Sequence, residues 1–313
     1  MAIMIITNRN IRRRHKDHRA FGDDFNRKGP MELRMAMAKK SGSRWRVDIV
    51  PETGISATNK PSTRIFCQFR NNLINKNRNC VLFVHGFNQD LKKNLEKCHE
   101  IESYGVDVVA FSWPSNPGGF KPIEYKRARR AAELSAPALD RVFEKLINNF
   151  QALDEDEMLR CRISYNFIAH SLGNYLFQNF IEKRLLDGET RLFDNIILHQ
   201  ADVNNRRHGR WVSQLRYARR IYVTHNEDDK VLDTSDIIMP NRLGNTTGNP
   251  EVRRAKYIDF TDAKHVGRDH RLWHEARRNK VVETFFGDVF NGRRGEAPLE
   301  NEPGGPSNVF IVR

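Results

Sequence analysis

Residues 165–180, with the sequence YNFIAHSLGNYLFQNF, constrain the fold more than any other stretch of this 313-residue chain. An apolar, strand-forming run ends at AHSLG, and apolar residues at helical spacing follow at once. This pattern predicts a tight strand-to-helix turn that presents the Ser171 hydroxyl beside the first amides of a helix. Ala169 and Gly173 are the small residues that such a turn needs on either side. Ser171 is therefore the candidate nucleophile, and the alternative is a structural serine in an ordinary turn.

Strand and helix signals alternate along most of the chain. We expect strands at residues 3–7, 45–50, 65–69, 81–85, 106–111, 163–169, 195–199, 220–224 and 256–260. We expect helices at residues 90–104, 125–150, 172–186 and 279–290. Strands that alternate with helices imply right-handed crossovers and a mostly parallel sheet. The predicted fold class is α/β, with a mostly parallel central sheet flanked by helices.

Composition shifts suggest three segments. Residues 1–44 are basic and polar, and we expect an N-terminal extension that wraps on the core or is partly disordered. Residues 45–290 carry the regular alternation and form the predicted α/β domain. Residues 291–313 are rich in Gly, Pro, Asn and Glu, which predicts a flexible C-terminal tail whose last residues, VFIVR, could dock on the body.

Positive charge is in clear excess, because 53 Lys and Arg against 39 Asp and Glu give a formal net charge of +14. The charge gathers in the runs RNIRRRHK near the N-terminus, KRARR at 126–130, NRRHGR at 205–210 and RYARR at 216–220. None of these runs has the interleaved aromatics or the motif of a nucleic-acid module. We therefore expect nonspecific association with anionic lipid or nucleic acid, rather than sequence reading.

Location and metal binding are constrained by what the sequence lacks. No apolar run approaches the roughly 20 residues that span a bilayer. The opening MAIMIITNRN places its charges after the apolar stretch, the reverse of a secretory signal, so a cytoplasmic location is expected. Ligand-type residues occur in HNEDD at 225–229 and in the group His199, Asp202 and His208, but neither has a dedicated metal-site spacing. We expect no metal.

An acyl-transfer site built on Ser171 needs backbone N–H donors for a developing oxyanion. One donor should be the residue after the nucleophile, Leu172. The other should come from a loop after an early strand, and VLFVHGFNQD at 81–90 offers such a loop. Gly86 lets the backbone approach a substrate closely, which makes the Phe87 N–H the second candidate donor.

These motifs resemble those of a known family, the α/β-hydrolase fold serine hydrolases, and more closely its bacterial esterase/lipase-like branch long known as a domain of unknown function. The motifs are ITNR near the start, VLFVHGFN, VVAFSWPS at 108–115, Tyr125, AHSLGN and YVTHNEDDKVL at 222–232. Apart from ITNR, the resemblance spans roughly residues 80–290. The resemblance implies an α/β-hydrolase fold, a Ser–Asp–His triad and no cofactor.

The resemblance implies a triad acid after the penultimate core strand, and Asp229 fits because KVL follows it directly. Asp228 competes with it, since the usual short turn is here the longer NEDDK. Asp202, after the preceding strand, is the third candidate.

The resemblance also implies a base after the last strand, and residues 260–279 hold His265, His270 and His274. His270 fits the His-x-x-aromatic spacing of the family and lies mid-loop, so it is the preferred candidate, with the other two left open.

The function implied is a serine hydrolase of the carboxylesterase or lipase type, acting on a small acyl ester through an acyl-enzyme intermediate. A thioesterase or amidase with the same triad is one alternative. Another is a non-catalytic module with this fold, whose basic surface binds anionic partners.

Overall fold

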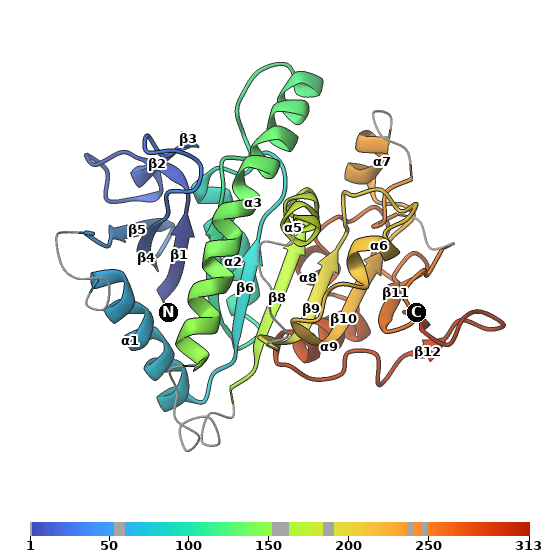
Figure 1. Cartoon of the computed structure of the whole chain (residues 1–313). Coiled ribbons are helices and arrows are strands. Elements are labelled where there is room, and N and C mark those ends of the chain that lie inside the picture. The colour runs from blue at the N-terminus through green and yellow to red at the C-terminus, as the bar shows by residue number, and fades with distance from the viewer. Residues whose placement is uncertain (1, 53–59, 152–162, 184–190, 237–240, 246–248) are drawn as a thin grey trace.

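The structure is a computed structural model that describes the chain except residues 1, 53–59, 152–162, 184–190, 237–240 and 246–248. Its centre is an 11-stranded sheet in the order β12-β13-β11-β10-β9-β8-β6-β7-β1-β4-β5, with helices on both faces (Figure 1). The eight central strands of this order, from β13 through to β1, pair parallel with their neighbours. At the edges the pairing is antiparallel: β12 pairs with β13, and β4 pairs with β1 and with β5. The mostly parallel sheet flanked by helices is thus as predicted.

The strands of the large sheet are β1 (Ala2–Thr7), β4 (Arg34–Ser41), β5 (Arg44–Ile49), β6 (Cys80–Val84), β7 (Asp107–Ser112), β8 (Tyr165–His170), β9 (Phe193–His199), β10 (Ala218–His225), β11 (Ala255–Asp259), β12 (Glu300–Asn301) and β13 (Val309–Ile311). A small second sheet pairs β2 (Arg9–Ile11) with β3 (Phe21–Phe25). The helices are η1 (His18–Ala20), α1 (Pro61–Lys76), α2 (Leu91–Glu102), α3 (Lys121–Gln151), α5 (Gly173–Glu182), α6 (Gly209–Val212), α7 (Lys230–Asp236), α8 (Leu272–Glu275) and α9 (Lys280–Phe290).

Two apolar layers hold the helices on the sheet. Every residue of β6 is buried, as expected for a central parallel strand that is covered on both faces. Leu82 and Val84 face the layer that includes α1, α3, α5 and α6, whereas Val81 and Phe83 face α2, α8 and α9. Because the strands are parallel, their carboxyl ends lie at one edge of the sheet, where the loops after β6, β8, β10 and β11 meet.

The N-terminal segment, which the sequence predicts to wrap on the core or to be partly disordered, contributes strands to the large sheet. β1 lies between β7 and β4 inside the sheet, with Met4 and Ile6 facing one apolar layer and Ile3 and Ile5 the other. β1 lies inside the sheet because a six-residue apolar strand can be buried on both faces, even though basic residues follow it in the sequence. The expected boundary after residue 44 therefore falls inside β5, directly after its first residue, Arg44, and β5 is paired with β4.

Two smaller expectations have clear outcomes. The strand predicted at residues 65–69 is wrong, because this run lies in α1, where Ser62, Phe69 and Leu73 form a buried stripe at helical spacing. At the other end, the docking of the last residues is confirmed, since β13 pairs parallel with β11 and with β12 forms the outer edge of the sheet. In the described part of the chain no helix is long and apolar enough to cross a membrane.

Candidate active site

Ser171 lies in a sharp turn between the end of β8 and the start of α5. Its φ of +53° is in the left-handed region, which residues with a Cβ seldom adopt outside special turns. The side chain is largely covered, with 5% of its residue surface exposed. This is the geometry that the AHSLG sequence predicts for a serine held at the mouth of a strand-to-helix turn.

The glycines near Ser171 are required by close backbone approach. A Cβ added to Gly173 would lie 2.6 Å from Val84 O and 2.7 Å from His85 O. A Cβ added to Gly86 would lie 2.7 Å from Ser171 Cβ. Because real Cβ atoms do not come so close to other atoms, the turn and the loop after β6 pack together only with glycine at both positions.

Hydrogen bonds fix the turn from within. The Ser171 amide donates to His199 O on the neighbouring strand at 3.0 Å. Asn174 Nδ2 donates to Ala169 O at 2.9 Å and to Ser171 O at 3.1 Å, so one buried amide bridges both sides of the turn. The role of Asn174 was not predicted, although the residue is the last letter of the AHSLGN motif.

Asp229 and His270 are brought together, with His270 Nδ1 2.6 Å from Asp229 Oδ2. Asp229 is fully buried, and its other oxygen accepts the amides of Val231 and Leu232 at the start of α7, at 2.9 and 3.1 Å. Gln200 Nε2 adds a bond of 2.9 Å to Oδ2. Because a carboxylate only accepts, the proton lies on His270 Nδ1, which leaves Nε2 free to act as a base.

The competing carboxylates lie elsewhere. Asp228 is exposed to solvent. Asp202 is buried, but its Oδ2 accepts from Tyr125 OH at 2.9 Å and its Oδ1 lies 3.6 Å from Arg242 Nε. Asp202 also donates its amide to Ser171 O at 3.2 Å, so it supports the turn by its backbone. Of the three candidate acids, only Asp229 contacts a candidate histidine.

The competing histidines are also separated from the site. His265 is exposed, and the half-exposed His274 has its Nε2 3.8 Å from Glu100 Oε1. The loop of His270 is held by Asn226, whose Nδ2 donates to Gly267 O and Asp269 O at 2.9 and 3.0 Å. Sequence reasoning missed Asn226, which lies inside the YVTHNEDDKVL motif.

Two buried histidine rings lie in a row next to His270. The rings of His170 and His270 have centroids 4.6 Å apart, which places the candidate base beside the residue that precedes Ser171. Burial first, and then repulsion from the neighbouring His270 ring whenever that ring is protonated, hold the pKa of His170 well below its ordinary value. Burial does the same to the pKa of His199, which stacks on His170. At neutral pH both rings are uncharged, so they do not repel an imidazolium formed at His270.

Each of the two candidate oxyanion donors adjoins one of two residues, Gly86 and Ser171, that pack against each other. Gly86 packs against the Ser171 side chain, Phe87 follows it, and Leu172 follows the serine. Among the described residues no oxygen accepts the backbone N–H of Phe87 or Leu172. Unpaired backbone amides are the kind of donor that stabilises a developing oxyanion, so both residues remain candidates for that role.

His85 holds the start of the loop after β6. Its Nε2 accepts the Trp113 amide at 3.1 Å, so its Nδ1 carries the proton and donates to Gly86 O at 3.0 Å. The His85 and Trp113 rings stack with centroids 5.4 Å apart. Burial holds the pKa of His85 well below its ordinary value, which keeps this bonding pattern at neutral pH.

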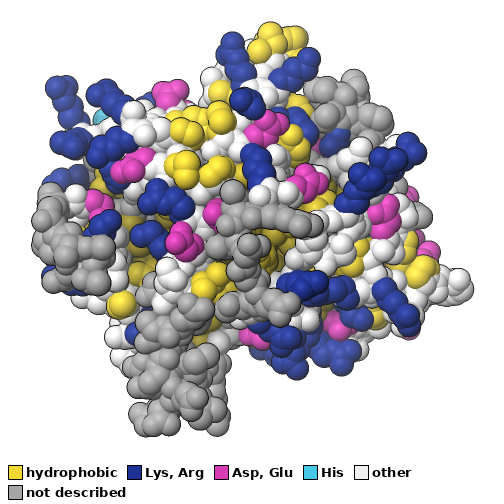
Figure 2. All heavy atoms as spheres, viewed as in Figure 1, with side chains coloured by type: hydrophobic (Ala, Val, Ile, Leu, Met, Phe, Trp, Pro, Cys, Tyr) yellow, Lys and Arg dark blue, Asp and Glu magenta, His cyan; other side chains and the backbone are white. Residues whose placement is uncertain are grey.

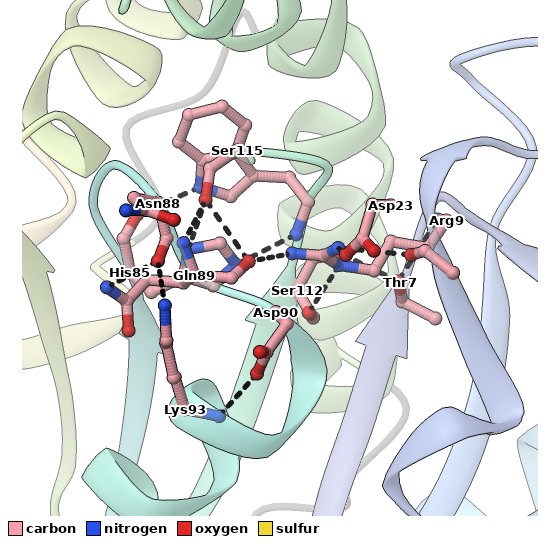
Figure 3. Close-up of polar contacts among 12 residues, drawn as sticks. Thr7, Arg9, Asp23, His85, Asn88, Gln89, Asp90, Lys93, Ser112 and Ser115 are labelled. Carbon is pink, nitrogen blue, oxygen red and sulfur yellow. Dashed lines mark hydrogen bonds and ion pairs between the residues drawn. The ribbon is translucent and has the colours of Figure 1, made fainter. Parts of the chain in front are cut away.

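Arg9 holds the end of the same loop (Figure 3). Its fully buried guanidinium donates to Gln89 O at 2.5 Å and to Ser112 Oγ at 3.0 Å, and pairs with Asp23 at 3.1 Å. Burial lowers the pKa of Arg9 to about 10, and the nearby Asp23 charge opposes that shift, so the side chain stays charged at neutral pH. Ser115 Oγ accepts the Gln89 amide at 3.0 Å from the other side. Arg9 is the last letter of ITNR, but its position next to this loop was not predicted.

Two of the histidines weighed as metal ligands have other partners. His199 Nδ1 lies 2.9 Å from Thr224 Oγ1, and His208 Nε2 lies 2.6 Å from Tyr257 OH. Within the described ranges no three His, Cys, Asp or Glu side chains converge in a way that could hold a metal ion.

A comparison with known protein families agrees with this fold. The model of a family described as "Alpha/beta hydrolase of unknown function (DUF900)" matches residues 65–288. The matched region contains Ser171, Asp229 and His270, as well as both candidate oxyanion donors. Searches among curated proteins and among solved structures found no match. Since the family model covers more than half of the chain, the protein belongs to this family of alpha/beta hydrolases of unknown function.

Proposed function

We propose that the protein is a serine hydrolase that cleaves a carboxylic ester through an acyl-enzyme intermediate. The observation that carries the proposal is the 2.6 Å contact between His270 Nδ1 and Asp229 Oδ2, beside the turn that holds Ser171 at a φ of +53°. Membership of the hydrolase family supports the reaction class. The resemblance to esterases and lipases supports the ester as substrate.

In the proposed reaction, His270 Nε2 takes the proton of Ser171 Oγ while Oγ bonds to the ester carbonyl carbon. The carbonyl electrons move onto its oxygen, and the amides of Phe87 and Leu172 donate to that oxyanion. When the tetrahedral intermediate collapses, the alcohol leaves with the proton from His270. Water then attacks the acyl group by the same steps, which releases the acid and restores Ser171.

Asp229 has a supporting part in this scheme. Its buried carboxylate keeps His270 in the tautomer with the proton on Nδ1 and stabilises the imidazolium that forms in each step. The amides of Val231 and Leu232, together with Gln200, fix the carboxylate in one orientation. The acid is therefore oriented before the substrate binds.

The test is pre-steady-state hydrolysis of p-nitrophenyl acetate by the full chain. We expect a burst of about one equivalent of p-nitrophenol and then a slower steady rate, because the acyl-enzyme accumulates. The matched acetyl thioester and p-nitroanilide separate the alternatives, and a higher kcat/KM on either would move the substrate class to thioesters or amides. No turnover of any of the three would favour the non-catalytic module.

A further inference from the structure

A basic groove lies beside the β2–β3 hairpin, with a volume of about 510 Å³. Five of its seven lining residues are Lys or Arg and none is acidic: Ile11, Arg13, Arg14, Asn26, Arg27, Lys28 and Arg34. Figure 2 shows Lys and Arg side chains gathered at the upper left, over the position of β2 and β3 in Figure 1. The hydrolase site described above uses none of these residues.

The fold brings these charges together from three places in the chain. Residues 13–14 follow β2, residues 27–28 follow β3, and Arg34 begins β4. Because β2 and β3 pair antiparallel, with Arg9 opposite Phe25 and Ile11 opposite Phe21, the two basic pairs lie at the two ends of a very short hairpin. The groove therefore runs along the hairpin with positive charge at both ends.

Backbone bonds fix both sides of the groove. The Arg12 amide donates to Ala20 O at 2.8 Å, and the Asn26 amide donates to Asn8 O at 2.8 Å. Asn26 Oδ1 accepts the Lys28 amide at 3.1 Å. The chain segments that carry the basic side chains are thus positioned without help from a ligand.

Most of these charges are not matched by nearby carboxylates. Glu32 pairs with Arg34. Two other nearby carboxylates form ion pairs with arginines outside the groove, Asp17 with Arg19 at 2.6 Å and Asp23 with Arg9 at 3.1 Å. No ion pair joins Arg13, Arg14, Arg27 or Lys28 to a carboxylate within the part of the chain that the structure describes. Crowded like charges destabilise one another, and a multivalent anion would relieve that repulsion.

We propose that this groove binds a compact polyphosphate, either a chain of linked phosphates or a small molecule that carries one. Guanidinium groups match phosphate oxygens through paired N–H donors, and several cations spaced along a groove match several phosphates. The volume is that of a small-molecule site. No aromatic residue lines the groove, so it lacks the stacking surface of a single-strand nucleic-acid site, and Ile11 alone is too little apolar surface for membrane insertion.

The test is isothermal titration of the full chain with inorganic tripolyphosphate at low salt, comparing two double variants. The groove variant is Arg13→Gln with Arg27→Gln, and the control is Arg206→Gln with Arg210→Gln, which removes the same charge from exposed positions elsewhere. We expect affinity to fall at least ~10-fold in the groove variant and less than ~2-fold in the control, because charge-assisted bonds to phosphate are lost only in the first. Circular dichroism checks the folding of both.

Several results would overturn the proposal. Equal losses in the two variants would assign binding to net charge alone. If the wild-type chain does not bind tripolyphosphate, the groove is not a polyphosphate site. Preferential binding, at equal phosphate concentration, of a single-stranded oligonucleotide or of vesicles with an anionic phospholipid would assign the groove to that macromolecule instead. None of these readouts depends on hydrolase activity, so the inference fails or stands apart from the proposed function.

Discussion

The two supports of Ser171 differ in where their residues come from. On the acid–base side, His270 contacts Asp229 across 41 positions of the chain, and both residues lie in loops after neighbouring strands. On the oxyanion side, the loop of Phe87 is held by Arg9, which lies 80 positions before its partner Gln89. The candidate acid and base thus come from the ends of two consecutive strands, whereas the contacts that hold the loop of the candidate oxyanion donor Phe87 reach back to the N-terminal strands.

The difference implies two kinds of failure. In the proposed reaction, losing a residue of the acid–base side removes a proton-transfer step, so the rate should collapse while the fold persists. Losing a contact of the oxyanion side should displace the donors without removing a reacting group, so the rate should fall less and stability should fall too.

The largest effect is expected for Ser171→Ala, which removes the proposed nucleophile common to both supports. We expect kcat for p-nitrophenyl acetate to fall by ~10⁴ or more, with unchanged circular dichroism, because only one hydroxyl is lost at the turn. Turnover within tenfold of wild type in the folded variant would refute the serine mechanism.

A loss of ~10³–10⁴ in kcat is expected for His270→Ala, because the base is absent. His265→Ala and His274→Ala are matched controls from the same loop region, and both should stay within about threefold, since these side chains are exposed. A collapse in either control, with a near-native His270→Ala, would move the base to that position.

Asp229→Asn should lower kcat by ~10³, because an amide cannot hold His270 with its proton on Nδ1 in the same way. Asp228→Asn, at the exposed position just before it, is the control and should have little effect. Asp202→Asn tests the third candidate. A large loss there with an active Asp229→Asn would place the acid after β9.

The smallest effect is expected for Arg9→Lys, which keeps the charge but cannot reach Gln89 O and Ser112 Oγ together. We expect kcat to fall ~10-fold with KM nearly unchanged, and the Tm to drop by several degrees. Arg14→Lys is the exposed control. A lower Tm with native kcat would show that Arg9 supports the fold but not the oxyanion donors.

The candidate reacting residues could be predicted because their signals are local. The turn at Ser171, with its glycine and its flanking strand and helix, is encoded in 16 consecutive residues. The order of Ser171, Asp229 and His270 along the chain then followed from the family resemblance. Of Asp228 and Asp229, it is Asp229 whose side chain points inward at the start of α7, and the spacing of the two residues does not encode this difference.

The supporting contacts could not be predicted, because they join segments far apart in the chain. Arg9 lies in a run of basic residues that suggested an N-terminal extension. Only the pairing of β1 with β7 places it next to the loop after β6. The run at residues 65–69 shows a second limit of prediction from sequence. A short apolar stretch fits a strand or a buried helix face equally well, and here it lies in α1.

The most direct test of the central claim is covalent labelling of the full chain by a fluorophosphonate, with the modified residue located by peptide mass spectrometry. The account predicts one label, on Ser171, and a labelling rate that falls by at least ~100-fold in His270→Ala, because the base that activates the hydroxyl is gone. A label on another residue, or no label on a folded chain that hydrolyses p-nitrophenyl acetate, would contradict it.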